Sequence, residues 1–211
     1  MSTTRRVTQL VLGLALFGAS IALLVRAELG LFPWDVLHQG VAQATGLPLG
    51  VVIVAASVVV LALWIPLRQR PGLGTLANVL LVGVFVDLSL AVVPTVDGLG
   101  ARVALLVGGV LLNAVATGLY IGAGLGPGTR DGLMTGLAAR GWSLRWSRLV
   151  IELLVLAVGF ALGGTVGIGT VVYALAVGPL VQPFLTLFTV PSARPAYRPA
   201  ADTVPSSGDL S

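Results

Sequence analysis

Three aspartates are the residues best placed to do chemistry, because each lies in or beside a long apolar segment. Asp35 ends the stretch LGLFPWD, Asp131 ends the similar stretch LGPGTRD, and Asp87 lies inside an apolar run. A charge at the centre of a bilayer costs about 3 kcal/mol on insertion scales, so an acid kept there is paired, protonated or functional. We expect Asp87 to face a cavity cleared by Gly83 and to act as a proton or cation coupling site.

Asp35 and Asp131 each come just before a short helical segment, which allows two interpretations. A carboxylate at a helix N-terminus accepts hydrogen bonds from free N–H groups and complements the helix dipole. Alternatively, irregular chain at membrane depth lines a cavity, and the two acids then meet near the midplane. Arg130 precedes Asp131 where Trp34 precedes Asp35, so the two half-sites would differ chemically.

Other polar side chains lie within the apolar runs. Asn113, Thr117 and Tyr120 fall on one helical face, for which hydrogen bonding between helices is the simpler explanation. Gln182 occupies the position that matches Asp87 in the second half of the chain. The candidates for a substrate or ion pathway are therefore Asp87, Asp35, Asp131, Arg130, Trp34, Gln182, Asn113, Thr117 and Tyr120.

Missing residue types exclude several kinds of site. The chain has no cysteine, no lysine and a single histidine, His38, which we expect at the outer surface. Because the HExxH, GxSxG and P-loop motifs are also absent, we expect no enzyme, no metal and no cofactor. A hydrolytic pair formed by Asp35 and Asp131 is the one enzymatic alternative. The pI near 10.7 does not indicate nucleic-acid binding, since the arginines are scattered between apolar runs.

The elements that hold these residues are predicted to be membrane helices. The composition is 56% hydrophobic and 9% charged, with a mean hydropathy of +1.02, so the solvent of this chain is a lipid bilayer. Two segments, 34–46 and 130–142, are too short to span and are expected to be re-entrant or interfacial helices. Apolar runs long enough to cross predict six transmembrane helices at about 7–26, 49–67, 74–94, 103–122, 146–163 and 169–189.

Arginine positions predict the orientation of these helices. With six spans and residues 1–6 in the cytoplasm, only Arg26 and Arg102 lie outside, as the positive-inside rule prefers. Both termini are then cytoplasmic, and the tail 190–211 is predicted to be disordered. Aromatic side chains at the membrane boundary are predicted to be Trp64, Trp142 and Trp146 on the cytoplasmic side and Trp34 on the outer side.

The order of sequence features indicates two copies of one pattern, at 7–94 and 103–189. Each copy has the order helix, LG…D turn, short helix, helix, G-x-GT, helix, and GLGT at 72–75 matches GIGT at 167–170. Three spans per copy is an odd number, so the second copy enters the membrane from the opposite side. Inverted repeats of this kind are the architecture of many secondary transporters.

The segments GLFPWDVLHQG, PGLGT and GLGPGTRDGLMTGL resemble the YczE/YitT-like group of bacterial integral membrane proteins. The resemblance implies a multi-pass protein of the bacterial inner (plasma) membrane with about six helices, and it supplies no substrate or catalytic residues.

We therefore expect a secondary transporter or exporter of a small solute, with a midplane site between inverted repeats. The alternatives are a channel of the hourglass type, and a non-transporting scaffold, regulatory or substrate-binding subunit of another system. The partners expected are the lipid bilayer and an unidentified small molecule or ion, with no nucleic acid. A homo-oligomer or a partner membrane protein is left open.

Overall fold

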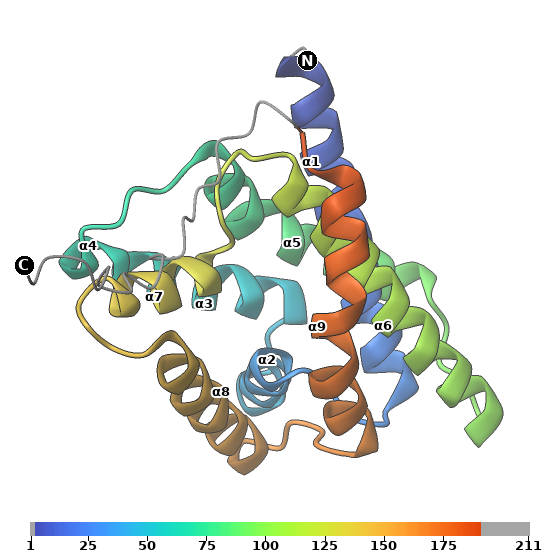
Figure 1. Ribbon diagram of the computed structural model, residues 1–211. Helices are drawn as coiled ribbons and strands as arrows, with labels where there is room; N and C mark the ends of the chain where they lie inside the picture. The colour runs from blue at the N-terminus through green and yellow to red at the C-terminus, as the bar shows by residue number, and fades with distance from the viewer. Residues whose placement is uncertain (1–2, 191–211) are drawn as a thin grey trace, which may run out of the picture.

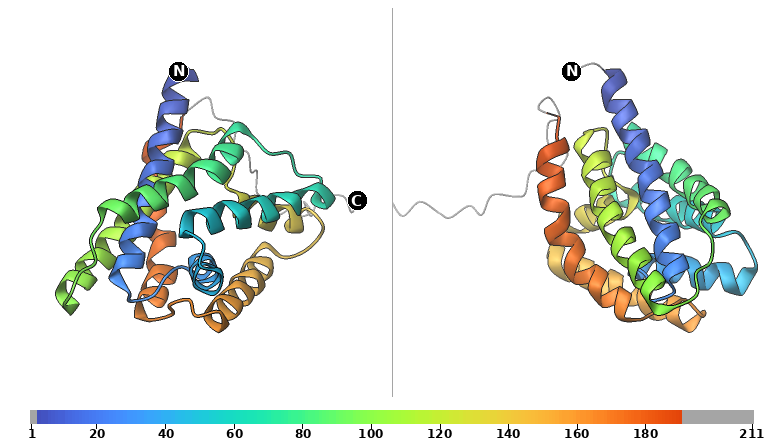
Figure 2. Two further views of the ribbon diagram at one scale, coloured as in Figure 1. Left: turned by 180° about the vertical axis from the view of Figure 1, so that it is seen from behind. Right: turned by 90° about the vertical axis from the view of Figure 1, so that its right-hand side faces the viewer.

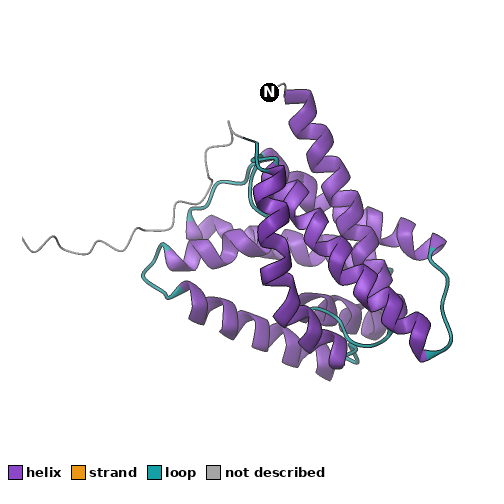
Figure 3. Cartoon of the chain, turned by 45° about the vertical axis from the view of Figure 1, so that its right-hand side comes forward, coloured by secondary structure: helices purple, strands orange, loops and turns teal. Residues whose placement is uncertain are grey.

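The computed structural model describes residues 3–190, and every regular element in this range is a helix (Figures 1 and 3). The all-α class is therefore confirmed. All eight segments expected to be helical form helices, and the predicted tail lies outside the described residues, apart from Val190. The helices are α1 Thr3–Ala27, α2 Pro33–Thr45, α3 Leu49–Ala62, α4 Trp64–Leu67, α5 Leu73–Val92, α6 Leu99–Gly122, α7 Thr129–Ala138, α8 Leu144–Ala161 and α9 Ile168–Phe188.

Local sequence signals set where the short helix α2 begins and ends. Pro33 occupies its first turn, where the missing N–H costs nothing. Gly46 ends the helix with a φ of 74°, and its N–H donates to the Ala42 carbonyl. This left-handed conformation favours glycine, which lacks the Cβ that makes it strained for other residues.

The long helices α1 and α6 form the centre of the molecule and pack on each other near both of their ends. Glycines allow this close approach: Gly13 of α1 lies against Tyr120, and Gly109 of α6 lies against Leu24. Helix α5 packs on the outside of α1, and α9 packs on the outside of α6 (Figure 2). The short helices lie to one side of this layer, where α2 packs on α8, and α7 packs on α3, α4 and α8 (Figure 1).

Between residues 3 and 190, five segments are long and apolar enough to cross a membrane, namely α1, α3 with α4, α5, α6 and α9. The surface of the helices suits lipid, because Leu80 on α5, Leu153 on α8 and Leu175 on α9 are each more than half exposed. The expected sixth span corresponds to α8, an 18-residue helix that carries Arg145, Arg148 and Glu152. The six-span arrangement therefore stays a prediction.

The LG turn of each half packs on the G-x-GT motif of the other half. The Gly169 N–H donates to the Leu29 carbonyl at 2.7 Å, and the Gly74 N–H donates to the Leu125 carbonyl at 2.8 Å. In both turns the glycine after the leucine has a positive φ, which brings the two backbones together. The motifs that repeat in the sequence are thus partners in space, each bound to the copy in the opposite half.

Three aromatic or polar residues were expected at the membrane boundary but are buried. Trp64 is 2% exposed and its indole N–H donates to the Thr129 carbonyl at 3.0 Å. Trp34 and His38 are 5% and 1% exposed, because α2 lies inside the molecule against α8. The expectation that His38 lies at the surface is therefore wrong, and Trp34 and Trp64 face protein, whereas Trp142 and Trp146 are exposed; the depth of the four tryptophans in the membrane stays a prediction.

Candidate functional site

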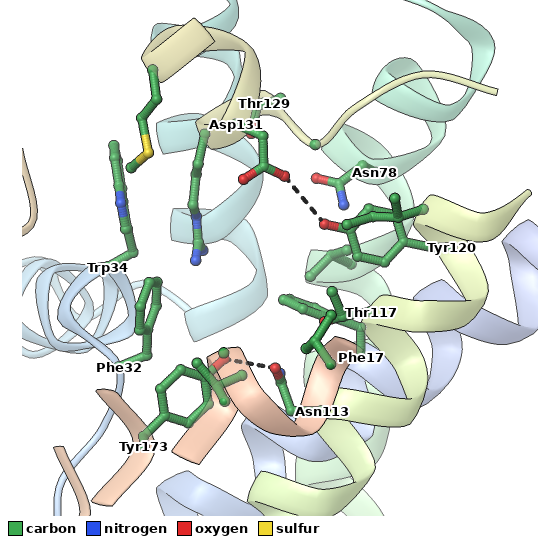
Figure 4. Close-up of a pocket in the computed structure, with 18 of the residues that line it drawn as sticks. Phe17, Phe32, Trp34, Asn78, Asn113, Thr117, Tyr120, Thr129, Asp131 and Tyr173 are labelled. Atoms are coloured by element: carbon green, nitrogen blue, oxygen red, sulfur yellow. Dashed lines mark hydrogen bonds between the residues drawn. The ribbon is translucent and has the colours of Figure 1, made fainter. Parts of the chain in front are cut away.

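A cavity of about 300 Å³ lies between the central helices and the short helices. Its walls come from both halves of the chain: Phe17, Phe32 and Asn78 belong to the first half, and Asn113, Tyr120 and Asp131 to the second. Figure 4 shows these side chains around a common space. The volume lies at the lower end of the roughly 300–1,000 Å³ that small-molecule sites occupy, so it suits a small ligand.

An ion pair that joins the two halves borders the cavity: Arg130 lines the cavity, and Asp35 binds Arg130 from outside the lining. The Arg130 Nη2 donates to Asp35 Oδ1 at 3.3 Å, and the side chain of Asp35 is 5% exposed. The Arg130 guanidinium also lies over the rings of Phe32 and Trp34, at 5.7 and 5.3 Å from their centroids. The aromatic faces attract the cation, so three residues of the first half hold one arginine of the second half.

Electrostatics keep Asp35 charged in spite of its burial. Burial alone would raise its pKa, but the nearby His38 imidazole and the Arg130 guanidinium outweigh this effect and lower the pKa. His38 Nδ1 lies 3.4 Å from the same carboxylate oxygen. Burial lowers the pKa of His38 itself, so the group is an uncharged imidazole between two charged neighbours. The Asp35 side chain is thus a partner of Arg130, and no capping bond from it to the backbone of α2 occurs.

Asp131 is the acid that remains accessible from the cavity. Its side chain is exposed, although it lies at the start of α7 between α6 and α8. The Tyr120 hydroxyl donates to Oδ2 at 3.5 Å, a long contact, and within residues 3–190 Asp131 forms no ion pair. Protein atoms displace part of the water around the carboxyl group, and this desolvation raises the pKa of Asp131. This carboxylate is therefore free to bind a proton or a ligand.

A chain of hydrogen bonds fixes the floor of the cavity. The Tyr173 hydroxyl donates to Asn113 Oδ1 at 2.6 Å, and Asn113 Nδ2 donates to the Ser20 hydroxyl at 2.9 Å. Ser20 in turn donates to the Phe17 carbonyl at 2.7 Å. Because each polar atom in this chain has a partner, Asn113 serves to join α1, α6 and α9.

Asp87 lies away from the cavity. The Gly50 N–H at the start of α3 donates to Asp87 Oδ1 at 2.7 Å, so this carboxylate occupies the positive end of a helix dipole. The backbone of α3 fills the space beside Gly83, and the expectation that Gly83 clears a cavity for Asp87 is wrong.

The second half has different residues at the positions that match Gly50 and Asp87. Arg145 stands where α3 has Gly50, and Gln182 stands where α5 has Asp87. Helix α3 packs along α5, but α8 and α9 do not pack along each other, and no atom approaches the Cβ position of Gly178 within 4 Å. Arg148, Glu152 and Gln182 line the cavity on this side. The cavity therefore lies beside a space between α8 and α9, because these two helices do not pack together.

Comparison with known proteins gives a family but no activity. A family described as a family of unknown function, DUF6198, matches residues 4–186. The chain belongs to this family. A Haemophilus influenzae relative called "Uncharacterized protein" is 36% identical over 184 residues, which is 87% of this chain and 84% of the relative. The "Uncharacterized membrane protein YczE" of Bacillus subtilis is 33% identical over 170 residues, 79% and 78% of the two chains.

The resemblance to the YczE group is thus confirmed, and this DUF6198 chain is a membrane protein. No solved structure matches it.

Most of the residues singled out in the DUF6198 sequence meet in the cavity. The cavity is lined by Arg130, Asp131, Trp34, Asn113, Thr117, Tyr120 and Gln182, whereas Asp35 reaches it only through Arg130 and Asp87 is elsewhere. Phe17, Phe32, Asn78 and Tyr173 were not expected there. Asn78 is an amide in an apolar helix, a signal of the kind that identified Asn113, but nothing distinguishes the three aromatic rings from other core residues. Within residues 3–190 no cluster of metal-ligating side chains occurs.

Proposed function

We propose that this protein is a secondary transporter that moves a small solute through the cavity between its two halves. The observation that carries the proposal is the cavity itself: its walls come from both halves, and charged side chains are among them. Charged groups inside a membrane protein usually face a pathway or each other. Arg130, on the cavity wall, binds Asp35, whereas Asp131 faces the cavity without an ion-pair partner within residues 3–190.

The repeat architecture supports this function. Each LG turn contacts the G-x-GT motif of the other half, and Gly13 of α1 and Gly109 of α6 each pack on the other of these two helices. A pseudo-two-fold axis between the halves would produce such reciprocal contacts. With α8 as the sixth span, each half has three spans, and the axis lies in the membrane plane. Transporters built from inverted repeats bind their substrates at the interface between the repeats.

We further propose that the protein lies in the bacterial inner (plasma) membrane with both termini in the cytoplasm. The distribution of arginines supports this orientation. Arg130 is excluded from that argument, because it is bound inside the cavity. With no nucleotide-binding motif in the sequence, the energy for accumulation would come from an ion gradient.

The test is flux through the purified full-length protein in liposomes. The panel contains a small amine, a carboxylate, an amino acid and a neutral polyol, followed as solute-induced currents and as proton movement with an internal pH dye. Thr117 lines the cavity on α6, and Thr117→Phe fills part of its volume. Thr186 is exposed on α9, so Thr186→Phe is the matched control.

We expect saturable flux of one solute class that Thr117→Phe abolishes and Thr186→Phe preserves. Flux that does not saturate would favour the channel. If no solute in the panel moved through protein that remained folded, the non-transporting membrane subunit would replace this proposal.

A further inference from the structure

We propose that the cavity binds a small organic ammonium ion, with its charged nitrogen at the carboxylate of Asp131, and that a proton competes with it for that carboxylate. This inference rests on the proposed transport function, for which it names the class of substrate.

The first step is the charge of the cavity. Arg130 is paired with Asp35, and Arg148 is paired with Glu152 at 2.8 Å. Each guanidinium therefore has a carboxylate partner, so an anionic ligand would have to displace one. Within residues 3–190 Asp131 is left as the charged group of the cavity without an ion-pair partner, and a carboxylate without a partner favours a monovalent cation.

The second step is the nature of the walls. Phe17 and Tyr120 meet edge to face with centroids 5.8 Å apart, and Phe32 and Tyr173 meet at 5.0 Å. Aromatic faces attract cations and also pack on apolar groups. Among the amides and hydroxyls beside them, Asn113 and Tyr173 already bond each other, and within residues 3–190 no cluster of metal-ligating side chains occurs. Since an inorganic cation would need several oxygen ligands in place of its water shell, the walls suit an ammonium group on an apolar body.

The third step concerns the proton. The protein around Asp131 raises its pKa, so protonation reaches this carboxylate at a higher pH than it would reach a free aspartate. A protonated carboxyl no longer attracts an ammonium ion, and the two cations exclude each other. The ionisable groups that face Asp131 are Arg130 on its own helix, Tyr120 on α6, Arg148 and Glu152 on α8, and the Asp35–His38 pair on α2. Helices α3 and α4, which also pack on α7, carry no ionisable group, and α5, which contacts α7 as well, carries Asp87, which binds the Gly50 N–H away from the cavity.

Binding of three ligands of nearly equal shape tests the proposal. Benzylammonium, benzyl alcohol and benzoate are cationic, neutral and anionic, and each is titrated calorimetrically into the full-length protein in lipid nanodiscs. We expect benzylammonium to bind and benzoate not to bind. Asp131→Asn should weaken benzylammonium binding about tenfold or more, the scale of a lost charge-assisted bond. Asp97→Asn in the exposed loop between α5 and α6 is the control and should change it less than about twofold.

A measurement on the unmodified protein covers the case in which Asp131→Asn fails to fold. Benzylammonium keeps its charge as the solution is made acidic, whereas Asp131, whose pKa is raised, takes up a proton progressively, so the affinity should fall as the pH falls. The proposal would be overturned if benzoate bound more tightly than benzylammonium, if the affinity for benzylammonium did not depend on pH, or if benzylammonium did not bind.

Flux of benzylammonium in liposomes separates the two proposals. Binding without flux would contradict the transport function and leave the ligand class standing. Flux of a carboxylate or a polyol without amine binding would contradict the ligand class and leave transport standing.

Discussion

Removing the positive partner of Asp35 should destabilise the protein strongly. Arg130→Met keeps the length of the side chain but leaves a carboxylate that is 5% exposed without its guanidinium. Breaking a buried ion pair on one side costs about 3–5 kcal/mol, because the remaining charge is neither solvated nor paired. The arginine also holds two aromatic rings together, at 5.7 and 5.3 Å, so a value in the upper part of that range is expected.

The assay is thermal unfolding of the detergent-solubilised protein, followed by tryptophan fluorescence. For a chain of this size 1 kcal/mol shifts the midpoint by about 2–4 °C, so we expect Arg130→Met to lower it by about 6–20 °C. Arg145→Met, at an exposed arginine on α8, is the control and should lower it by less than about 2 °C.

A double variant tests the cause of this loss. In Asp35→Asn with Arg130→Met neither charge remains, and we expect most of the lost stability to return, since the cost comes from the unpaired carboxylate. If the single Arg130→Met variant unfolds within about 2 °C of the unmodified protein, or if the double variant is no more stable than the single one, the ion pair does not hold the two halves together.

Two further predictions concern the fold. Asp87→Ala removes the acceptor at the start of α3 and should cost about 1 kcal/mol of stability while leaving benzylammonium affinity unchanged; a loss of binding at preserved stability would instead return Asp87 to the pathway. Reporter fusions after Asp97 and after Ser192 should read outside and cytoplasmic if α8 crosses the membrane, because six spans return the tail to the side of the N-terminus. If both reporters were found on the same side of the membrane, the six-span topology would be excluded.

The candidate site was only partly accessible to sequence reasoning. Polar residues beside or within apolar runs pointed to Asn113 and Asp131, which line one cavity, and to Asp35, which binds Arg130 at its edge. The same rule also pointed to Asp87, which binds the start of α3 instead. Polarity in an apolar run reports that a side chain needs a partner, but a helix N-terminus and a solute pathway satisfy that need equally well. Only the packing of α3 on α5 distinguishes them.

The sequence by itself determined the helices and the medium. Apolar runs, Pro33 and Gly46 act through contacts within a few residues, so they set where helices begin and end wherever the chain is placed. The low fraction of charged residues likewise makes a lipid bilayer the solvent of the chain, whichever tertiary contacts form.

Only the tertiary structure decided which side chains meet. Trp34 and His38 belong to a segment too short to span, and the sequence placed them at the outer surface; the packing of α2 on α8 buries them inside instead. Arg130 was expected to make one half-site differ from the other, but its partners were not predicted: it binds Asp35 and stacks on Trp34 in the other half. Partners so far apart in the chain are selected by shape and charge once the helices have formed, and no pattern of neighbouring residues encodes that choice.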